Sequence, residues 1–368
     1  MRRPKHQHFI PKSYLKNFAI CKGEKQFVEA KLRNEDEPKQ GLISINDICV
    51  NKNIYTIPNK DEDKKYALED YYAREIDAIY PDVYNLLVNP EITEIDANQR
   101  GKIIKTTMNL FFRTPKFLNS NQRTTNHILD YAIRNFKDMN GNVKFEFKGT
   151  KLNFNVKDVD DVRLGLKIDN KVKFLKDHLN DWHQFINFKL YSAISVYHIY
   201  DDIDLITSDN PVIMHSIKGN SFNVFDPSNM ISLPLDNKHY LSIFPNTEEA
   251  MLNTIYRTQR DKWFALSTNL QVEKNCEEWI MGKPNSIFAH ISDKAKYNEE
   301  TPENLQAVLD MKQRAEDGME LAKTMELYGF NHQNVADKVK DMLKLKIHKD
   351  DLEILKISIE LAKRGFAI

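Results

Sequence analysis

The chain has 368 residues, of which 41% are hydrophobic and 29% charged, an ordinary composition for a globular protein. Its 53 basic and 53 acidic residues cancel, which argues against a protein that coats nucleic acid through overall charge but not against a local basic groove. Three scattered cysteines without a CxxC pair disfavour a disulfide scaffold or a structural zinc site, and no apolar run approaches the roughly 18 residues of a membrane span.

The amino-terminal segment is basic. MRRPKHQHFIPK lacks the apolar stretch of about 7–15 residues that a signal peptide needs, so we expect a soluble, cytoplasmic protein with reduced thiols and no membrane partner. Residues 1–23 hold six Lys or Arg and neither Asp nor Glu. This segment is either a solvated basic terminus or a surface that faces an anion.

Helical patterns dominate the first half of the chain. We expect a turn and short helix at 6–20, with Pro11 in its first turn, and a strand at 26–33, where apolar and polar residues alternate. An amphipathic helix is predicted at 67–88, where Pro81 favours a kink. A second long helix is predicted from Asp96, as a cap, to Thr114, and another at 124–138.

Strand patterns follow. Residues 144–156 alternate around Gly149, which is typical of a hairpin, and helix returns at 159–188. Strands are predicted at 191–199, 204–215, 230–236 and 239–244, the last two meeting across Asp236-Asn237. Residues 247–268 and several segments of 302–368 read as helices. The prediction is an α+β fold, with helical layers on a modest, mainly antiparallel sheet, divided into a main domain at 1–300 and a helical extension at 301–368.

One family resemblance spans most of these elements. The segment HFIPKSYLKNF has the pattern H-x-x-P-x-x-Y-L-x-x-F, and FFRTP at 111–115, ITSDNPV at 206–212 and LPLD at 233–236 follow in order. Over about residues 6–270 the chain resembles the bacterial domain-of-unknown-function family 4238. Asp236 and Asn237 depart from it, because its usual block has Ser-Pro there. The resemblance implies no agreed activity; some members are associated with mobile or defence-related genes.

The blocks of the resemblance supply candidate site residues. His8 is a candidate general acid or base, Tyr14 a proton or hydrogen-bond donor, and Arg113 a clamp for an anion. Asp209, with Ser208 and Asn210, is a candidate for orienting a substrate, and Asn253 for positioning a water or a base edge. His6 and Lys12 complete the set as substrate-binding candidates in the basic terminus.

Each candidate has a structural alternative. His8 and Pro11 are also suited to orienting a helix, and Arg113 to pairing with Glu69 or Glu75 at a helix end. Ser-Asp-Asn-Pro is good turn chemistry in its own right, since Asp and Asn close Asx turns and Pro fixes φ. The sequence leaves these alternatives open.

We therefore expect a nuclease-like or nucleotide-targeting effector acting in bacterial anti-phage defence, with nucleic acid or a nucleotide as its partner. The alternative is a non-catalytic ligand-binding or regulatory module, and a third hypothesis is a scaffold that self-associates or binds a protein through 301–368. No phosphate loop, HExxH or GxSxG motif occurs, and His6 and His8 lack nearby partners for a metal site. No cofactor is expected, with a divalent metal as the open alternative.

Overall fold

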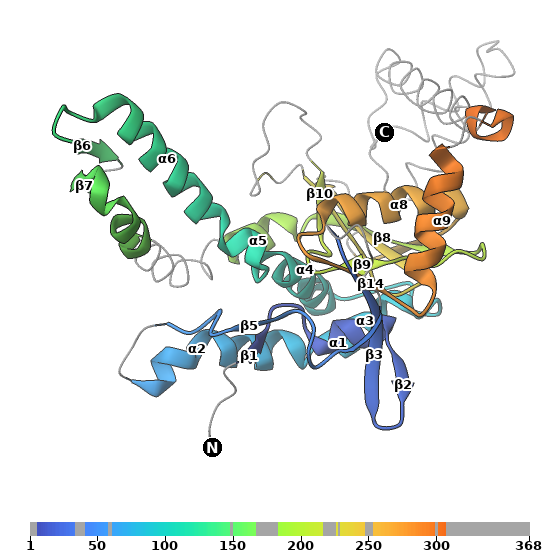
Figure 1. The fold of residues 1–368 in the computed structure, drawn as a ribbon. Coiled ribbons are helices and arrows are strands. Elements are labelled where there is room, and N and C mark those ends of the chain that lie inside the picture. Colours follow the sequence, from blue (N-terminus) through green and yellow to red (C-terminus); the bar gives the residue numbers. More distant parts are fainter. Residues whose placement is uncertain are drawn as a thin grey trace, which may run out of the picture.

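The computed structural model describes residues 6–33, 41–57, 61–147, 150–166, 183–215, 226, 229–246, 253–298 and 301–306. Within these ranges the fold is α+β, as predicted, with helices packed on mainly antiparallel sheets (Figure 1). None of the helices in these ranges is both long and apolar enough to cross a membrane. The proposed extension at 301–368 lies outside the described residues apart from 301–306.

The amino-terminal elements are short and deeply packed. β1 (His6–His8) pairs antiparallel with β5 (Val50–Lys52), and α1 (Lys12–Leu15) continues into the 3-10 turn η1 (Lys16–Phe18). Tyr14, Leu15 and Phe18 are completely buried in the main core. The helical spacing of the family block therefore serves to insert three large side chains into the protein interior.

The predicted helix at 67–88 is divided into three parts: α2 (Glu62–Tyr72), the π-helical turn η2 (Ala73–Asp77) and α3 (Tyr80–Val88), with Pro81 in the first turn of α3. Proline suits that position because its missing N–H would have no intrahelical partner. α4 (Ala97–Phe112) starts at Asp96, whose side chain and that of Gln99 form a reciprocal capping box. Thr114 caps the next short helix, α5 (Pro115–Leu118).

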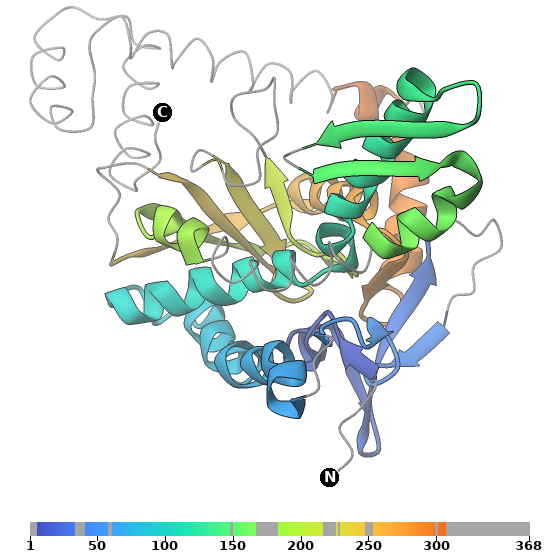
Figure 2. The ribbon, with the colours of Figure 1, turned by 90° about the vertical axis from the view of Figure 1, so that its left-hand side faces the viewer.

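The main sheet carries the order β10-β11-β12-β8-β13. Its strands are β8 (Ser192–Ile199), β10 (Ile213–His215), β11 (Met230–Pro234), β12 (His239–Asn246) and β13 (Ile255–Arg260). β11 and β12 form the predicted hairpin across Asp236-Asn237, whereas β13 runs parallel to β8. Figure 2 shows α4 passing beside this sheet, and Ile103 and Ile104 of α4 share the main core with Ile194 of β8.

A second sheet joins the amino-terminal and carboxy-terminal parts of the described chain. Its order is β2-β3-β14-β9, with β4 also pairing with β3. The strands are β2 (Ile20–Lys22), β3 (Lys25–Leu32), β4 (Gly41–Ser44), β9 (Thr207–Ser208) and β14 (Trp279–Gly282). β9 therefore brings the SDNP turn into the sheet that follows the amino-terminal block.

An arm stands apart from the body of the molecule (Figure 1). It is built from α6 (Ser120–Phe136), the predicted hairpin β6 (Asn142–Phe147) and β7 (Thr150–Asn155), the turn η3 (Val156–Asp158) and the helical residues 159–166. Leu129, Ala132, Val143 and Phe154 form its own small core. Residues 183–189 return to helix before β8.

The predicted helix at 247–268 is wrong over residues 253–260, and its residues 247–252 lie outside the described ranges. Residues 255–260 form β13, and the helix α8 (Lys262–Asn275) starts after Asp261, whose carboxylate accepts the N–H of Phe264 at 3.1 Å. β13 exists because β8 offers it a parallel partner. Asn253 consequently lies in an exposed turn before a strand rather than on a helix. α9 (Ser286–Asn298) completes the described elements of the body.

Candidate functional site

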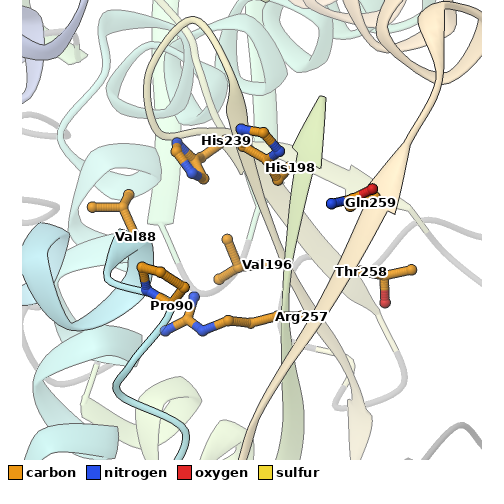
Figure 3. A pocket seen from close by; sticks show the side chains of 8 residues that line it. All are labelled: Val88, Pro90, Val196, His198, His239, Arg257, Thr258 and Gln259. Carbon is orange, nitrogen blue, oxygen red and sulfur yellow. The ribbon is translucent and has the colours of Figure 1, made fainter. Parts of the chain in front are cut away.

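The register of the main sheet places a row of polar side chains across three strands. His239 of β12 pairs with His198 of β8, and His198 pairs in turn with Gln259 of β13. Residues paired in this way point to the same face of a sheet. Figure 3 shows the two imidazoles next to each other and Gln259 beyond His198. The row therefore gathers two histidines and an amide from segments that lie far apart in the sequence.

The adjacent row and the end of α3 build an apolar wall beside these polar groups. Val196 lies two residues before His198, on the same face, and pairs with Arg257. The guanidinium of Arg257 donates to the carbonyls of Leu86 at 3.0 Å and Leu87, at the end of α3. Arg257 thus binds the carbonyls that a helix terminus leaves without partners and holds α3 against the sheet.

A cavity of about 390 Å³ opens between these parts, within the size range of small-molecule sites (Figure 3). The residues that line it are Val88, Pro90, Val196, His198, His239, Arg257, Thr258 and Gln259. Apolar side chains line one part of the cavity, and the two imidazoles lie at another. This arrangement suits a ligand that has one apolar portion and one portion that exchanges protons.

His239 is oriented by a buried carboxylate. Its Nδ1 lies 2.9 Å from Oδ2 and 3.0 Å from Oδ1 of Asp236, which is 6% exposed. Asp236 Oδ1 also accepts the backbone N–H groups of Lys238 (2.7 Å) and His239 (2.8 Å). Tyr84 of α3 donates its hydroxyl to Oδ2 at 2.5 Å. The carboxylate therefore fixes the ring of His239 through Nδ1, and no hydrogen bond within the described part of the chain engages Nε2.

Asp236 stays ionised despite its burial. Burial alone would raise the pKa of this carboxyl, but the hydrogen bonds from His239, Tyr84 and the backbone outweigh that effect and lower the pKa. Burial and the nearby carboxylate together raise the pKa of Tyr84, so its hydroxyl remains a donor. An ionised carboxylate at Nδ1 stabilises the imidazolium that forms when Nε2 takes up a proton.

His198 has a different environment from its neighbour. The centroids of the His198 and His239 rings are 5.0 Å apart, and their planes make an angle of 48°. Burial, followed by the proximity of His239, lowers the pKa of His198 below its ordinary value. The pair thus combines one imidazole supported by a carboxylate with one that favours its neutral form, which is the asymmetry that an acid and a base require.

His8 and Arg113, predicted from the amino-terminal and RTP blocks, belong to a buried brace around the Arg113 side chain. Arg113 is 3% exposed; it pairs with Asp77 at 2.6 Å and donates to the backbone carbonyl of His8 at 2.6 Å. Its guanidinium also lies 4.8 Å from the centroid of the Tyr72 ring. His8 Nε2 lies 3.1 Å from the carbonyl oxygen of Ile45, and burial lowers the pKa of His8. His8 and Arg113 do come together, through a main-chain oxygen of His8.

Tyr14 joins the same core to the SDNP segment. Its buried hydroxyl lies 2.6 Å from Thr207 Oγ1 and donates to the carbonyl of Pro234 at 2.8 Å. Burial raises the pKa of Tyr14 far above its ordinary value. The hydroxyl is therefore a fixed hydrogen-bonding group between β9 and the end of β11.

The SDNP residues are likewise occupied by main-chain contacts. Asp209 accepts the N–H groups of Glu277 at 3.0 Å and Glu278 at 2.7 Å, and burial raises the pKa of its carboxyl. Ser208 Oγ accepts the N–H of Asn210 at 3.2 Å, and the Asn210 amide donates to the carbonyl of Asn275 at 3.1 Å. These contacts are those of a buried turn that holds the segment after α8.

The remaining candidates lie at the surface. His6 and Lys12 are exposed, and exposed Asn253 accepts the N–H of Ile95 through its carbonyl at 2.7 Å. The residues around the 390 Å³ cavity do not include any of the candidates predicted from the sequence. Within the described ranges, no group of three or more His, Cys, Asp or Glu could hold a metal ion.

A family model described as a protein of unknown function (DUF4238) matches residues 6–286. The chain belongs to the DUF4238 family. The match covers the amino-terminal block, the cavity and the SDNP turn, and it ends at Ser286, the first residue of α9. No curated protein and no solved structure matches the chain. The DUF4238 assignment therefore identifies the family without naming a reaction, and the chemistry has to be argued from the cavity.

Sequence reasoning did not single out His198, His239 or Tyr84 of this DUF4238 chain. Two signals could have found the histidines. Asp236 precedes His239 by three residues, which is the spacing of a side chain that folds back over a turn. His198 ends the strand predicted at 191–199. The contact between the two histidines depends on strand register, which neither signal supplies.

Proposed function

We propose that the protein is a nuclease-like enzyme that cleaves phosphoesters by histidine acid–base chemistry in the cavity lined by His198 and His239. The observation that carries the proposal is the imidazole of His239, held through Nδ1 by buried Asp236 and lying 5.0 Å, centroid to centroid, from a second imidazole. A carboxylate-supported histidine beside another histidine supplies the two proton transfers that breaking a P–O bond requires.

The surroundings favour a nucleotide unit as the ligand. Val88, Pro90 and Val196 offer apolar surface for a sugar or base, and the Gln259 amide can both donate and accept hydrogen bonds. The mechanism that follows has two steps. One imidazole accepts a proton from the attacking hydroxyl, and the other donates a proton to the leaving oxygen.

Purified full-length protein tests this proposal. Labelled RNA and DNA oligonucleotides of one sequence are incubated with the wild type, His198→Gln and His239→Gln, with and without a divalent metal. Removal of a proton-transfer group costs roughly 10²- to 10⁴-fold in rate. We expect losses of that size in both variants at a temperature where each is folded; His239→Gln should also lower the melting temperature, because buried Asp236 loses a hydrogen-bond partner. The matched control is His127→Gln, which changes an exposed histidine on α6 and should retain the wild-type rate.

One outcome would favour the non-catalytic alternative instead. The wild type would then cleave neither polymer, while nucleotides raised its melting temperature and His239→Gln removed that effect. Equal cleavage by the wild type and both histidine variants would reject the cavity as the site. The role in anti-phage defence belongs to the same proposal, and loss of protection in cells that carry His239→Gln would support it.

A further inference from the structure

If the cavity cleaves phosphoesters, as proposed above, a nucleophile has to attack the phosphorus. Asp236 is the carboxylate closest to the histidine pair in the contacts described, and its oxygens are not free to attack the phosphorus. Oδ1 accepts two backbone N–H groups, and Oδ2 accepts the Tyr84 hydroxyl at 2.5 Å and lies 2.9 Å from His239 Nδ1. Asp236 is thus a positioning residue for His239.

The side chains that line the cavity include one hydroxyl, that of Thr258. Thr258 pairs with Tyr197, which packs in the separate cluster around Phe264, whereas the flanking Arg257 and Gln259 pair with Val196 and His198. Because successive strand residues point to opposite faces, Thr258 is directed away from the imidazoles. Figure 3 shows this orientation. Among the described lining residues, the side chains that face the site besides the two imidazoles are therefore not nucleophiles.

With the imidazoles assigned to proton transfer, the nucleophile is either water or a group that arrives with the substrate, and a tethered group has the advantage of proximity. A hydroxyl on the carbon next to a phosphodiester is already tethered beside the phosphorus. Such tethering is equivalent to a very high local concentration, with measured effective molarities of roughly 10⁵–10⁸ M for well-oriented groups. The 2′-hydroxyl of a ribonucleotide meets this requirement, whereas a deoxyribonucleotide has no equivalent group.

We propose that the substrate is RNA, and that the cavity promotes attack of the ribose 2′-oxygen on the adjacent phosphorus with His198 as base and His239 as acid. The O2′–P bond forms and the P–O5′ bond breaks. A ring nitrogen of His198 takes the proton from O2′, and Nε2 of His239 gives a proton to O5′. The products are a 2′,3′-cyclic phosphate and a free 5′-hydroxyl, so atoms and charge balance without a further reactant.

The assignment of the two roles follows from the contacts of each ring. The carboxylate of Asp236 stabilises a protonated His239, which suits the acid. His198 lies beside that ring and favours the neutral form, which suits the base. Gln259, next to His198 in the row, is placed to hydrogen-bond a phosphate oxygen or a base edge of the bound nucleotide.

Three oligonucleotides of one sequence separate this inference from the proposed function: all-RNA, all-2′-O-methyl RNA and DNA. They are incubated with the full chain, and the product ends are identified by mass spectrometry. We expect cleavage of RNA alone, at least about 100-fold faster than the other two, with 2′,3′-cyclic phosphate ends that are absent with His239→Gln.

Cleavage of the DNA or 2′-O-methyl strand at a similar rate, or products with 5′-phosphates, would overturn the RNA inference. If His239→Gln also stopped that cleavage, the proposed phosphoester chemistry would stand. If the wild type cleaved none of the three, the proposed function itself would fail together with the inference. Cleavage of RNA to 2′,3′-cyclic phosphate by His127→Gln at the wild-type rate would show that the loss of cleavage in His239→Gln is specific to the cavity.

Discussion

The buried brace around Arg113 yields a quantitative prediction about stability. Arg113 is 3% exposed, while the side chain of its partner Asp77 is 31% exposed. Removal of one partner from a buried ion pair costs roughly 3–5 kcal/mol, mostly because the other charge is left without compensation. Asp77→Ala strands the deeply buried guanidinium, so we expect a loss of about 3–5 kcal/mol in the free energy of unfolding.

Arg113→Met should cost a similar amount for a different reason. The carboxylate of Asp77 can then turn to water, but the carbonyl of His8 loses its donor, which costs about 1–3 kcal/mol, and the contact with the Tyr72 ring adds about 1 kcal/mol. The double variant leaves no stranded guanidinium. Its destabilisation should therefore fall at least about 2 kcal/mol short of the sum of the two single variants.

Chemical denaturation of the two single variants and the double variant measures this coupling. Additive effects, or single losses below about 1 kcal/mol, would refute a buried ion pair at this position. RNA cleavage by the same proteins supplies the second readout. If Arg113→Met kept its stability but lost cleavage, Arg113 would belong to a substrate site, as the family block first indicated.

Four more predictions follow from single contacts. Tyr14→Phe leaves the Thr207 hydroxyl and the Pro234 carbonyl without their partner and should cost about 1–3 kcal/mol of stability in denaturant, with cleavage retained. Burial lowers the pKa of Lys189 to about 7, although Asp226 opposes this shift, so between about pH 7 and pH 10.5 the unfolded chain keeps a proton on Lys189 that the folded chain has lost. The free energy of unfolding should therefore rise with pH over this range, and Lys189→Met should flatten that rise relative to the wild type. The pKa of His198 is lowered, so the rate of cleavage should fall on acidification only below the ordinary value of 6.5, an acid limb that His198→Gln removes. Asp236→Asn keeps an oxygen for the backbone cap but presents an amide to Nδ1 of His239 and to the Tyr84 hydroxyl, which loses its acceptor; we expect about a 10²- to 10⁴-fold lower rate and a changed pH profile, with a loss of about 1–3 kcal/mol in the free energy of unfolding.

Local patterns predicted the fold well wherever local chemistry decides it. The alternation around Gly149 gave the arm hairpin, and the Asp96 cap marks the start of α4. The region before Asp261 failed because Ile255–Arg260 becomes a strand by pairing with β8, more than fifty residues earlier in the chain. The hydrophobic periodicity of a short sequence window contains no information about a strand partner that lies so far away in the chain.

The same limit explains the candidate site. The family blocks contain polar residues such as Arg113 and Asp209, and a motif search ranks such residues as catalytic. In the fold they satisfy main-chain groups that burial would otherwise leave unpaired. His198 and His239, by contrast, stand outside any sequence motif and meet only because β8 and β12 adopt one particular register.

Asp236 has one role in the hairpin and another in the candidate site. A serine at this position could accept the same backbone N–H groups at the start of β12, because a hydroxyl oxygen closes such a turn as well. A hydroxyl would not supply the negative charge that orients Nδ1 of His239 and stabilises its protonated form. The carboxylate is therefore more than the hairpin needs, and the proposed acid–base chemistry depends on this additional charge.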